Sequence, residues 1–163
     1  MSGIVRIAAV GTVLAASAVL VVGATASASD RGNRPGDKRH GNETTLHFDV
    51  NTSPSSYTDL GKPGPSAADV IVFNDTLLHN RRTVGHEVGS CVVVDPSGVA
   101  NCTGVATVDG RGTIAFAFEN GPPARKILAI TGGSGAYRTA RGDGVLVESG
   151  HETATLDLSL VLD

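Results

Sequence analysis

One acidic residue, Asp75, lies among apolar residues in a segment whose side chains alternate. In an extended strand, Asp75 shares one face with Ile71, Phe73 and Leu77. An acid on an apolar face points to a cavity more than to a solid core. Burial raises the pKa of a carboxyl group, which can then act as an acid or a base near neutral pH. We therefore predict that Asp75 lies inside an apolar cavity.

A second acid and two cysteines extend this pattern. Glu87 lies two residues before Gly89 and four before Cys91, so Glu87 can line the same cavity. Cys91 and Cys102 flank the segment DPSG, residues 95–98. If these four residues form a hairpin loop, the thiols face each other and a disulfide can form. If a G1 bulge shifts the register by one residue, the thiols point to opposite faces. We favour the disulfide.

Two further charged residues allow two interpretations each. Asp49 alternates with Phe48 and Val50, so it fits either a cavity group or a solvent-facing side chain on a half-buried strand. Arg141 fits either a functional guanidinium or an ion pair with Asp143 at the rim of the fold. The pattern alone does not choose between them.

Alternation of apolar and polar residues dominates the chain after about residue 45. Between the alternating segments lie turn clusters such as GKPGPS, DPSG and TGGSG, and 21 glycines disfavour long helices. Eight strands are predicted, near residues 45–51, 69–78, 86–94, 100–108, 112–119, 126–131, 143–148 and 154–162. Such a series of short strands indicates an all-β sandwich or barrel.

The N-terminal residues have the order of features of a secretory signal peptide. Arg6 precedes an uncharged run, residues 7–24, and Ala26 and Ala28 offer a cleavage site. We expect three parts: a signal peptide (1–28), a flexible polar tail (29–44) and a β-barrel domain (45–163). Cleavage predicts a secreted, extracellular protein without stable membrane insertion.

Several function classes are disfavoured. Residues 29–163 carry 12 basic and 16 acidic residues, so nucleic acid is not an expected partner. TGGSG lacks the lysine of a phosphate loop and opens no helical pattern. His79 and His86 stand apart from other ligand types, so no metal is expected. No cofactor is expected either.

Four segments resemble the allene oxide cyclases and the related dirigent proteins. ILAITGGSGAYRTARGDG (127–144) is similar to the AITGGSG of the cyclases and to the GGTG, aromatic and ARG of the dirigents. DVIVFNDTLL (69–78) resembles GDLVPFTNKL and VFDDPL, VGHEVGSCVVV (84–94) resembles VGITAGLCVLI, and FDVN (48–51) is similar to YEIN. The resemblance covers roughly residues 46–162. It implies an eight-stranded antiparallel β-barrel, commonly a homotrimer, with an apolar cavity open at one end.

The resemblance also assigns roles. Asp49, Asn51, Asp75 and Cys91 match polar positions of the cyclase motifs, and Asp75 and Arg141 match the dirigent motifs. The expected catalytic residues are Asp75, Asp49, Asn51 and Arg141; the expected ligand contacts are Phe73, Glu87, Cys91 and Tyr137. Ala136 stands where dirigents usually carry an acid, so neither plant activity transfers directly and the substrate stays unassigned.

Two functions from different classes follow. The first is a cofactor-free cyclase or isomerase, or a dirigent-like stereochemical guide, acting on a hydrophobic small molecule. The second is a non-catalytic carrier of such a molecule. Convergence of Asp49, Asn51 and Asp75 inside the barrel would favour catalysis, whereas a lumen lined only by Leu, Val and Phe would favour the carrier.

Overall fold

The computed structural model describes residues 42–53, 55–150 and 152–163. The predicted signal peptide and residues 29–41 of the predicted tail lie outside this range. Within the described residues, no helix is both long and apolar enough to cross a membrane.

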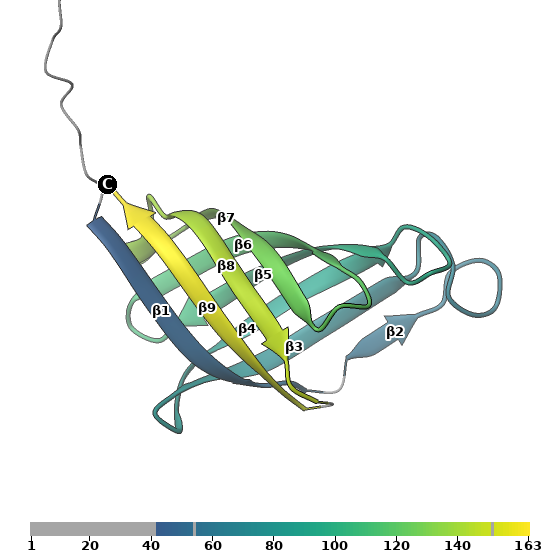
Figure 1. Cartoon of the computed structure of the whole chain (residues 1–163), viewed down its shortest axis with the longest axis horizontal. Helices are drawn as coiled ribbons and strands as arrows, with labels where there is room; N and C mark the ends of the chain where they lie inside the picture. Colours follow the sequence, from purple (N-terminus) through teal and green to yellow (C-terminus); the bar gives the residue numbers. More distant parts are fainter. Residues whose placement is uncertain (1–41, 54, 151) are drawn as a thin grey trace, which may run out of the picture. The chain divides into compact units, whose positions relative to one another are not determined.

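Nine antiparallel strands form one sheet, and all but one short strand close into an eight-stranded barrel (Figure 1). The strands are β1 (Asn42–Asn51), β2 (Ser56–Thr58), β3 (Val70–His79), β4 (Arg82–Val93), β5 (Ala100–Val108), β6 (Gly112–Asn120), β7 (Arg125–Gly133), β8 (Arg141–Glu148) and β9 (Thr153–Leu162). The barrel closes because β1 pairs with both β9 and β3. The short β2 pairs with β3 beyond the point where β1 ends. The predicted eight-stranded antiparallel barrel is confirmed.

Alternation of side chains explains why these segments form barrel strands. In β9, Ala154, Leu156, Leu158 and Leu160 are buried, and the residues between them are partly or fully exposed. Each fully buried leucine contributes roughly 1.5–3 kcal/mol relative to an exposed one. A shift of one residue would turn this apolar face outwards, so burial of the face fixes the register.

The strand ends differ from the predicted ones by a few residues. β1 begins at Asn42 rather than at residue 45, because residues 42–44 pair with Leu160–Leu162 of β9. β4 begins at Arg82 rather than at residue 86, because it forms a tight hairpin with β3. The polar residues at these ends give no alternation signal, whereas backbone pairing extends the strands through them.

β2 was not predicted, and a buried acid explains why it forms. The carboxylate of Asp69 accepts hydrogen bonds from the Leu60 N–H at 2.7 Å, from the Ser66 N–H at 2.6 Å and from the hydroxyl of Tyr57 in β2. The bond from Tyr57 is the largest cause that lowers the pKa of Asp69, and it raises the pKa of Tyr57 to about 12. These bonds hold the connection between β2 and β3 against the end of the barrel.

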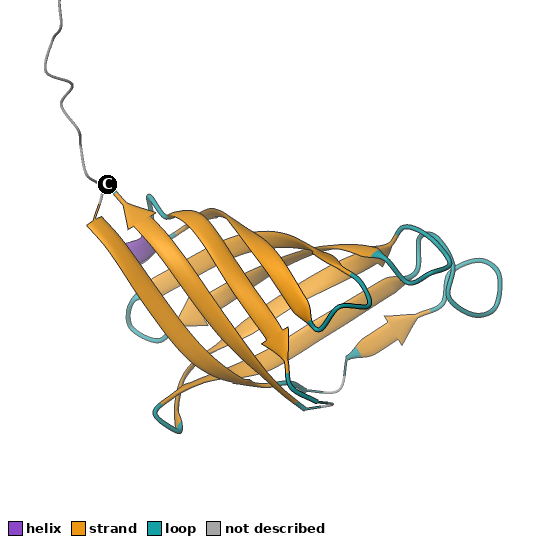
Figure 2. Ribbon diagram, in the orientation of Figure 1, coloured by secondary structure: helices purple, strands orange, loops and turns teal. Residues whose placement is uncertain are grey.

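Side chains fill the opposite end of the barrel. The 3-10 turn η1 (Gly135–Tyr137), the only helical turn among the described residues, lies there (Figure 2). Tyr137 is fully buried in the same apolar cluster as Ile114, Ile130 and Leu160. The Arg111 guanidinium lies 5.4 Å from the centre of the Tyr137 ring. This end is therefore packed, and the other end is left for a cavity.

Candidate functional site

A cavity of about 500 Å³ occupies the barrel lumen near the end where β8 turns into β9. Strands β3 to β6 form one wall as rows of directly opposed side chains. The rim row is Ile71, Cys91, Cys102 and Phe118; the ring row is Phe73, Gly89, Gly104 and Phe116; the acid row is Asp75, Glu87, Ala106 and Ile114. The facing wall is apolar, from Leu128, Leu146, Ala154 and Leu156. The rim row and the acid row lie four positions apart along a strand, which is about 13 Å.

Glycines in the ring row make space for two aromatic rings. Phe73 is opposite Gly89, and Phe116 is opposite Gly104. A Cβ atom at Gly89 would lie 2.3 Å from the Phe73 ring, and one at Gly104 would lie 2.5 Å from the Phe116 ring. Both rings therefore lie over glycine backbone, and this arrangement sets the width of the cavity.

We expect Gly104→Ala to force the Phe116 ring to move. Overpacking of this kind typically lowers the free energy of unfolding by about 1–3 kcal/mol. Gly121→Ala is the matched control, because its Cβ would meet nothing closer than 3.9 Å. Urea denaturation of both variants measures the difference. Equal stability of the two variants would contradict the proposed packing of Phe116 on Gly104.

The acid row brings two carboxyl groups together. Asp75 of β3 is directly opposite Glu87 of β4, and their residues are only 7% and 3% exposed. A bulge determines this pairing, because β4 contains one extra residue, Val84, between the partners of Leu77 and Leu78. If Val84 paired with Leu77 in a regular hairpin register, with no bulge, His86 would lie opposite Asp75. The bulge therefore selects a carboxyl pair.

The environment of the pair favours the protonated forms. Burial, followed by the nearby charge of Asp75 and the hydrogen bond to it, raises the pKa of Glu87 to about 7. Burial also raises the pKa of Asp75, opposed by a hydrogen bond at 2.8 Å from the Ser53 N–H and by the bond with Glu87. Two interacting carboxyls titrate as a unit. Near neutral pH the pair can share one proton and so contain both an acid and a base.

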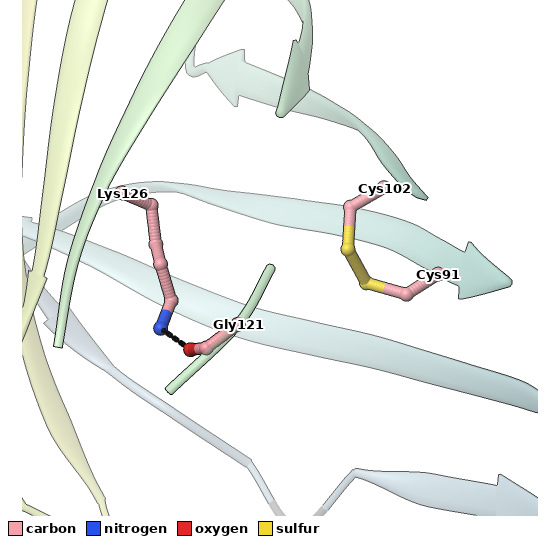
Figure 3. Close-up of a disulfide and its surroundings, with 4 residues drawn as sticks. All are labelled: Cys91, Cys102, Gly121 and Lys126. Carbon is pink, nitrogen blue, oxygen red and sulfur yellow. Dashed lines mark hydrogen bonds between the residues drawn. A yellow bond between two sulfur atoms is a disulfide. The ribbon is translucent and has the colours of Figure 1, made fainter. Parts of the chain in front are cut away.

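A disulfide and a buried lysine fix the rim of the cavity (Figure 3). Cys91 and Cys102 are opposed and bonded, so the predicted disulfide is confirmed, with the DPSG loop in the hairpin register. The Lys126 ammonium donates to the carbonyl oxygen of Gly121 at 2.7 Å and to that of Pro123, and lies 3.2 Å from the Glu148 carboxylate. Lys126 thereby ties β7 to the loop after β6.

Three of the expected ligand contacts line the cavity, namely Phe73, Glu87 and Cys91. The fourth, Tyr137, lies at the packed end and does not line it. Of the expected catalytic residues, only Asp75 lines the cavity.

Asp49, Asn51 and Arg141 lie on the outside, so the expected convergence with Asp75 is not found. Asp49 and Asn51 are exposed, because the inward positions of β1 belong to Phe48 and Val50. Arg141 is exposed and pairs with Asp163, not with Asp143.

Sequence reasoning missed three features of the site. Phe116 had no assigned role, although its position opposite a glycine is a signal for an inward ring. Ser53, whose N–H donates a hydrogen bond to Asp75, lies outside the predicted strands. The pairing of Glu87 with Asp75 had no signal, because it depends on the bulge. In the described residues, no group of three or more His, Cys, Asp or Glu side chains could hold a metal ion.

No protein-family model and no curated protein matches the sequence. Solved structures do match. The chain is similar to a pyocyanin demethylase, with a TM-score of 0.66 and 25% identity over 72% of this chain and 100% of that chain. It is also similar to a pterocarpan synthase dirigent protein, with a TM-score of 0.60 and 18% identity over 84% of this chain and 100% of the other.

A third similar structure is a heme-binding cyclase that catalyses a cycloaddition in neoabyssomicin biosynthesis. The TM-score is 0.60, with 14% identity over 76% of this chain and 68% of that chain. At these identities the likeness concerns the fold. The resemblance to dirigent-type barrels that the sequence motifs indicated is therefore confirmed for the fold of this chain.

Proposed function

We propose that the protein binds a hydrophobic small molecule in the barrel lumen and isomerises or cyclises it, or guides its coupling, without a cofactor. One observation carries the proposal: the Asp75 and Glu87 carboxyls are paired inside a largely apolar cavity. The similar structures include a demethylase, a dirigent protein and a cyclase, which supports a role on small organic molecules. Export belongs to the same proposal, and the disulfide supports it, since such bonds persist in oxidising compartments.

The carboxyl pair can supply acid and base in one step. The protonated carboxyl donates its proton to a substrate atom on which negative charge develops, and the carboxylate removes a proton from another atom of the same molecule. The pair then holds one proton as before, on the other carboxyl, and the hydrogen bond between the two groups can return it. An isomerisation or ring closure balanced in this way needs no external reagent. The apolar wall orients the substrate and excludes water.

The test begins with a ligand that the protein itself retains. Native mass spectrometry of the purified protein identifies such a molecule, and its conversion is then followed with the wild type and with Asp75→Asn. We expect Asp75→Asn to lower turnover by about 10²–10⁴-fold while binding persists, as is typical for the loss of an acid or base. Glu119→Gln is the control, because Glu119 is exposed on β6 and does not line the cavity.

Two results would contradict the proposal in different ways. Unchanged kinetics in Asp75→Asn would remove Asp75 from the mechanism. A retained molecule that the wild type binds and never converts would favour the carrier.

A further inference from the structure

The charged side chains on the cavity wall are all acidic among the described residues. Asp75, Glu87 and Glu148 line the cavity, and no Lys, Arg or His of the described ranges does so. The other polar lining residues are neutral: Thr52, Ser53, Ser55, Asn120 and Thr153. The charge of the lumen therefore depends on whether a nearby cation compensates these acids.

Lys126 is the only buried cation in the described part of the chain, and its contacts are already taken. An ammonium group has three donors. The Lys126 Nζ meets the carbonyl oxygens of Gly121 and Pro123 and the Glu148 carboxylate. Lys126 therefore balances Glu148 at the rim and has no donor left for the deeper acids or for a ligand.

The acid row is left both charged and incompletely hydrogen-bonded. With one shared proton, the pair of Asp75 and Glu87 carries a net charge of about −1. The Glu87 oxygen Oε2 is buried and has no hydrogen-bond partner. A buried polar atom without a partner is costly, and the cost disappears when a ligand supplies a donor. The carboxyl pair is therefore incompletely hydrogen-bonded, and both of its residues line the cavity.

From this arrangement we infer that the cavity selects ligands with an apolar body and a hydrogen-bond donor, such as a hydroxyl or an ammonium group, and rejects carboxylates and other anions. This inference rests on the proposed function and narrows its substrate class. The donor meets the carboxyl pair of the acid row, and the apolar body lies between the rings of Phe73 and Phe116 and the facing leucines.

Among the residues that the structure describes, no cationic side chain lines the cavity beside the pair to offset repulsion of an anion. The inward residues next to Glu87 are Asp75 on β3 and Ala106 on β5. The cavity residues of β6, β7 and β9 beside them are apolar, namely Phe116, Leu128 and Leu156, and β8 contributes Leu146. The charged rim residue of β8, Glu148, is itself acidic. A carboxylate ligand would thus meet like charge in a poorly screened site.

The experiment compares three ligands that share one naphthalene body. Naphthyl-ethanol, naphthyl-ethylamine and naphthyl-acetate compete with the neutral fluorescent reporter N-phenylnaphthylamine for the purified protein at about pH 8, where the pair is ionised. We expect naphthyl-acetate to bind about tenfold or more weakly than naphthyl-ethanol, and naphthyl-ethylamine to bind at least as tightly as the alcohol. Equal affinity of the acetate and the alcohol would overturn the inference.

Two double variants distinguish the effect of charge inside the cavity from the effect of the net charge of the protein. Glu87→Gln alone leaves Asp75 to ionise, so its pocket keeps about one negative charge. The double variant Asp75→Asn/Glu87→Gln removes that charge, and we expect the gap between acetate and alcohol to shrink to about threefold or less. The control Glu43→Gln/Glu119→Gln removes two exposed acids outside the cavity and should keep the full gap. A gap unchanged in the first double variant would also overturn the inference.

Failure of the inference and failure of the proposed function give different results. If the reporter binds and the anion binds as well as the alcohol, the apolar cavity stands and only the charge selection is wrong. If neither the reporter nor any naphthyl ligand binds, the small-molecule cavity itself is rejected, and the inference is rejected with it.

Discussion

Glu87→Gln will remove most of the pH dependence of unfolding between pH 4.5 and about 7, the ordinary and the folded-state pKa of Glu87. Below pH 4.5, Glu87 is protonated in both states. Between the two values, the unfolded chain releases the proton while the folded barrel keeps it, so rising pH favours unfolding. Above about 7, both states are ionised. The wild type therefore loses about 3 kcal/mol of unfolding free energy as pH rises through this window.

Urea denaturation at several pH values, on the wild type and on Glu87→Gln, measures this effect. The raised pKa of Asp75 acts in the same direction, whereas the lowered pKa values of Asp69 and Asp95 make those groups titrate below the window. The control Glu119→Gln should keep the wild-type profile. A Glu87→Gln variant whose stability falls with pH as steeply as that of the wild type would show that Glu87 is not buried beside Asp75.

Removing the disulfide will lower the unfolding free energy by about 2–3 kcal/mol. The bond between Cys91 and Cys102 closes a short loop, with a sequence separation of 11, and such a cross-link restricts the unfolded chain at the low end of the usual range. Both residues are buried in one cluster with Val93 and Ala100, so alanine at both positions keeps an apolar environment. The variant Cys91→Ala/Cys102→Ala is measured by urea denaturation.

A reductant supplies the internal control for this prediction. Reduced wild type should unfold at nearly the same urea concentration as the double alanine variant, and the variant should not respond to the reductant. If oxidised wild type and variant unfold at the same urea concentration, the cross-link does not stabilise the barrel.

The barrel could be predicted from the sequence because its core is periodic. The alternation from Ala154 to Leu162 specifies a strand with one buried face, and β9 has that face. β2 could not be predicted in the same way, because its three residues are exposed and polar. It forms through the hydrogen bond from Tyr57 to Asp69, which joins residues that no local pattern connects.

The candidate site was predictable only in part, for the same reason. Alternation placed Asp75 and Glu87 on inward faces, and both line the cavity. Their pairing depends on the bulge at Val84 and on a tight turn in which Asn80 and Arg81 both have positive φ, of 52° and 62°. This turn type usually contains glycine, and neither Asn80 nor Arg81 is glycine, so the turn could not be predicted from the sequence.

The family resemblance placed Asp49 wrongly, at a position where the alternation of side chains allowed either a cavity-facing or a solvent-facing orientation. Its motif match assigned Asp49 to the cavity. The alternation with Phe48 and Val50 also allowed a solvent-facing side chain, and that reading holds, since Phe48 and Val50 are 4% and 1% exposed and Asp49 faces outwards. A motif match aligns a residue with a position in the sequence of the family. Whether its side chain faces the cavity or the solvent depends on how the neighbouring side chains pack.

The side chains that line the lumen are arranged in rows at different depths. The residues of one row can therefore be substituted without changing the residues of the others. The rim row contains the disulfide, the ring row contains the two aromatic rings, and the acid row contains the carboxyl pair. Each row is separated from the next by one outward residue, so a substitution in one row leaves the backbone ladder of the others in place. A substitution at one depth of the lumen can therefore change the side chains that a ligand meets there while the wall at the other depths stays the same.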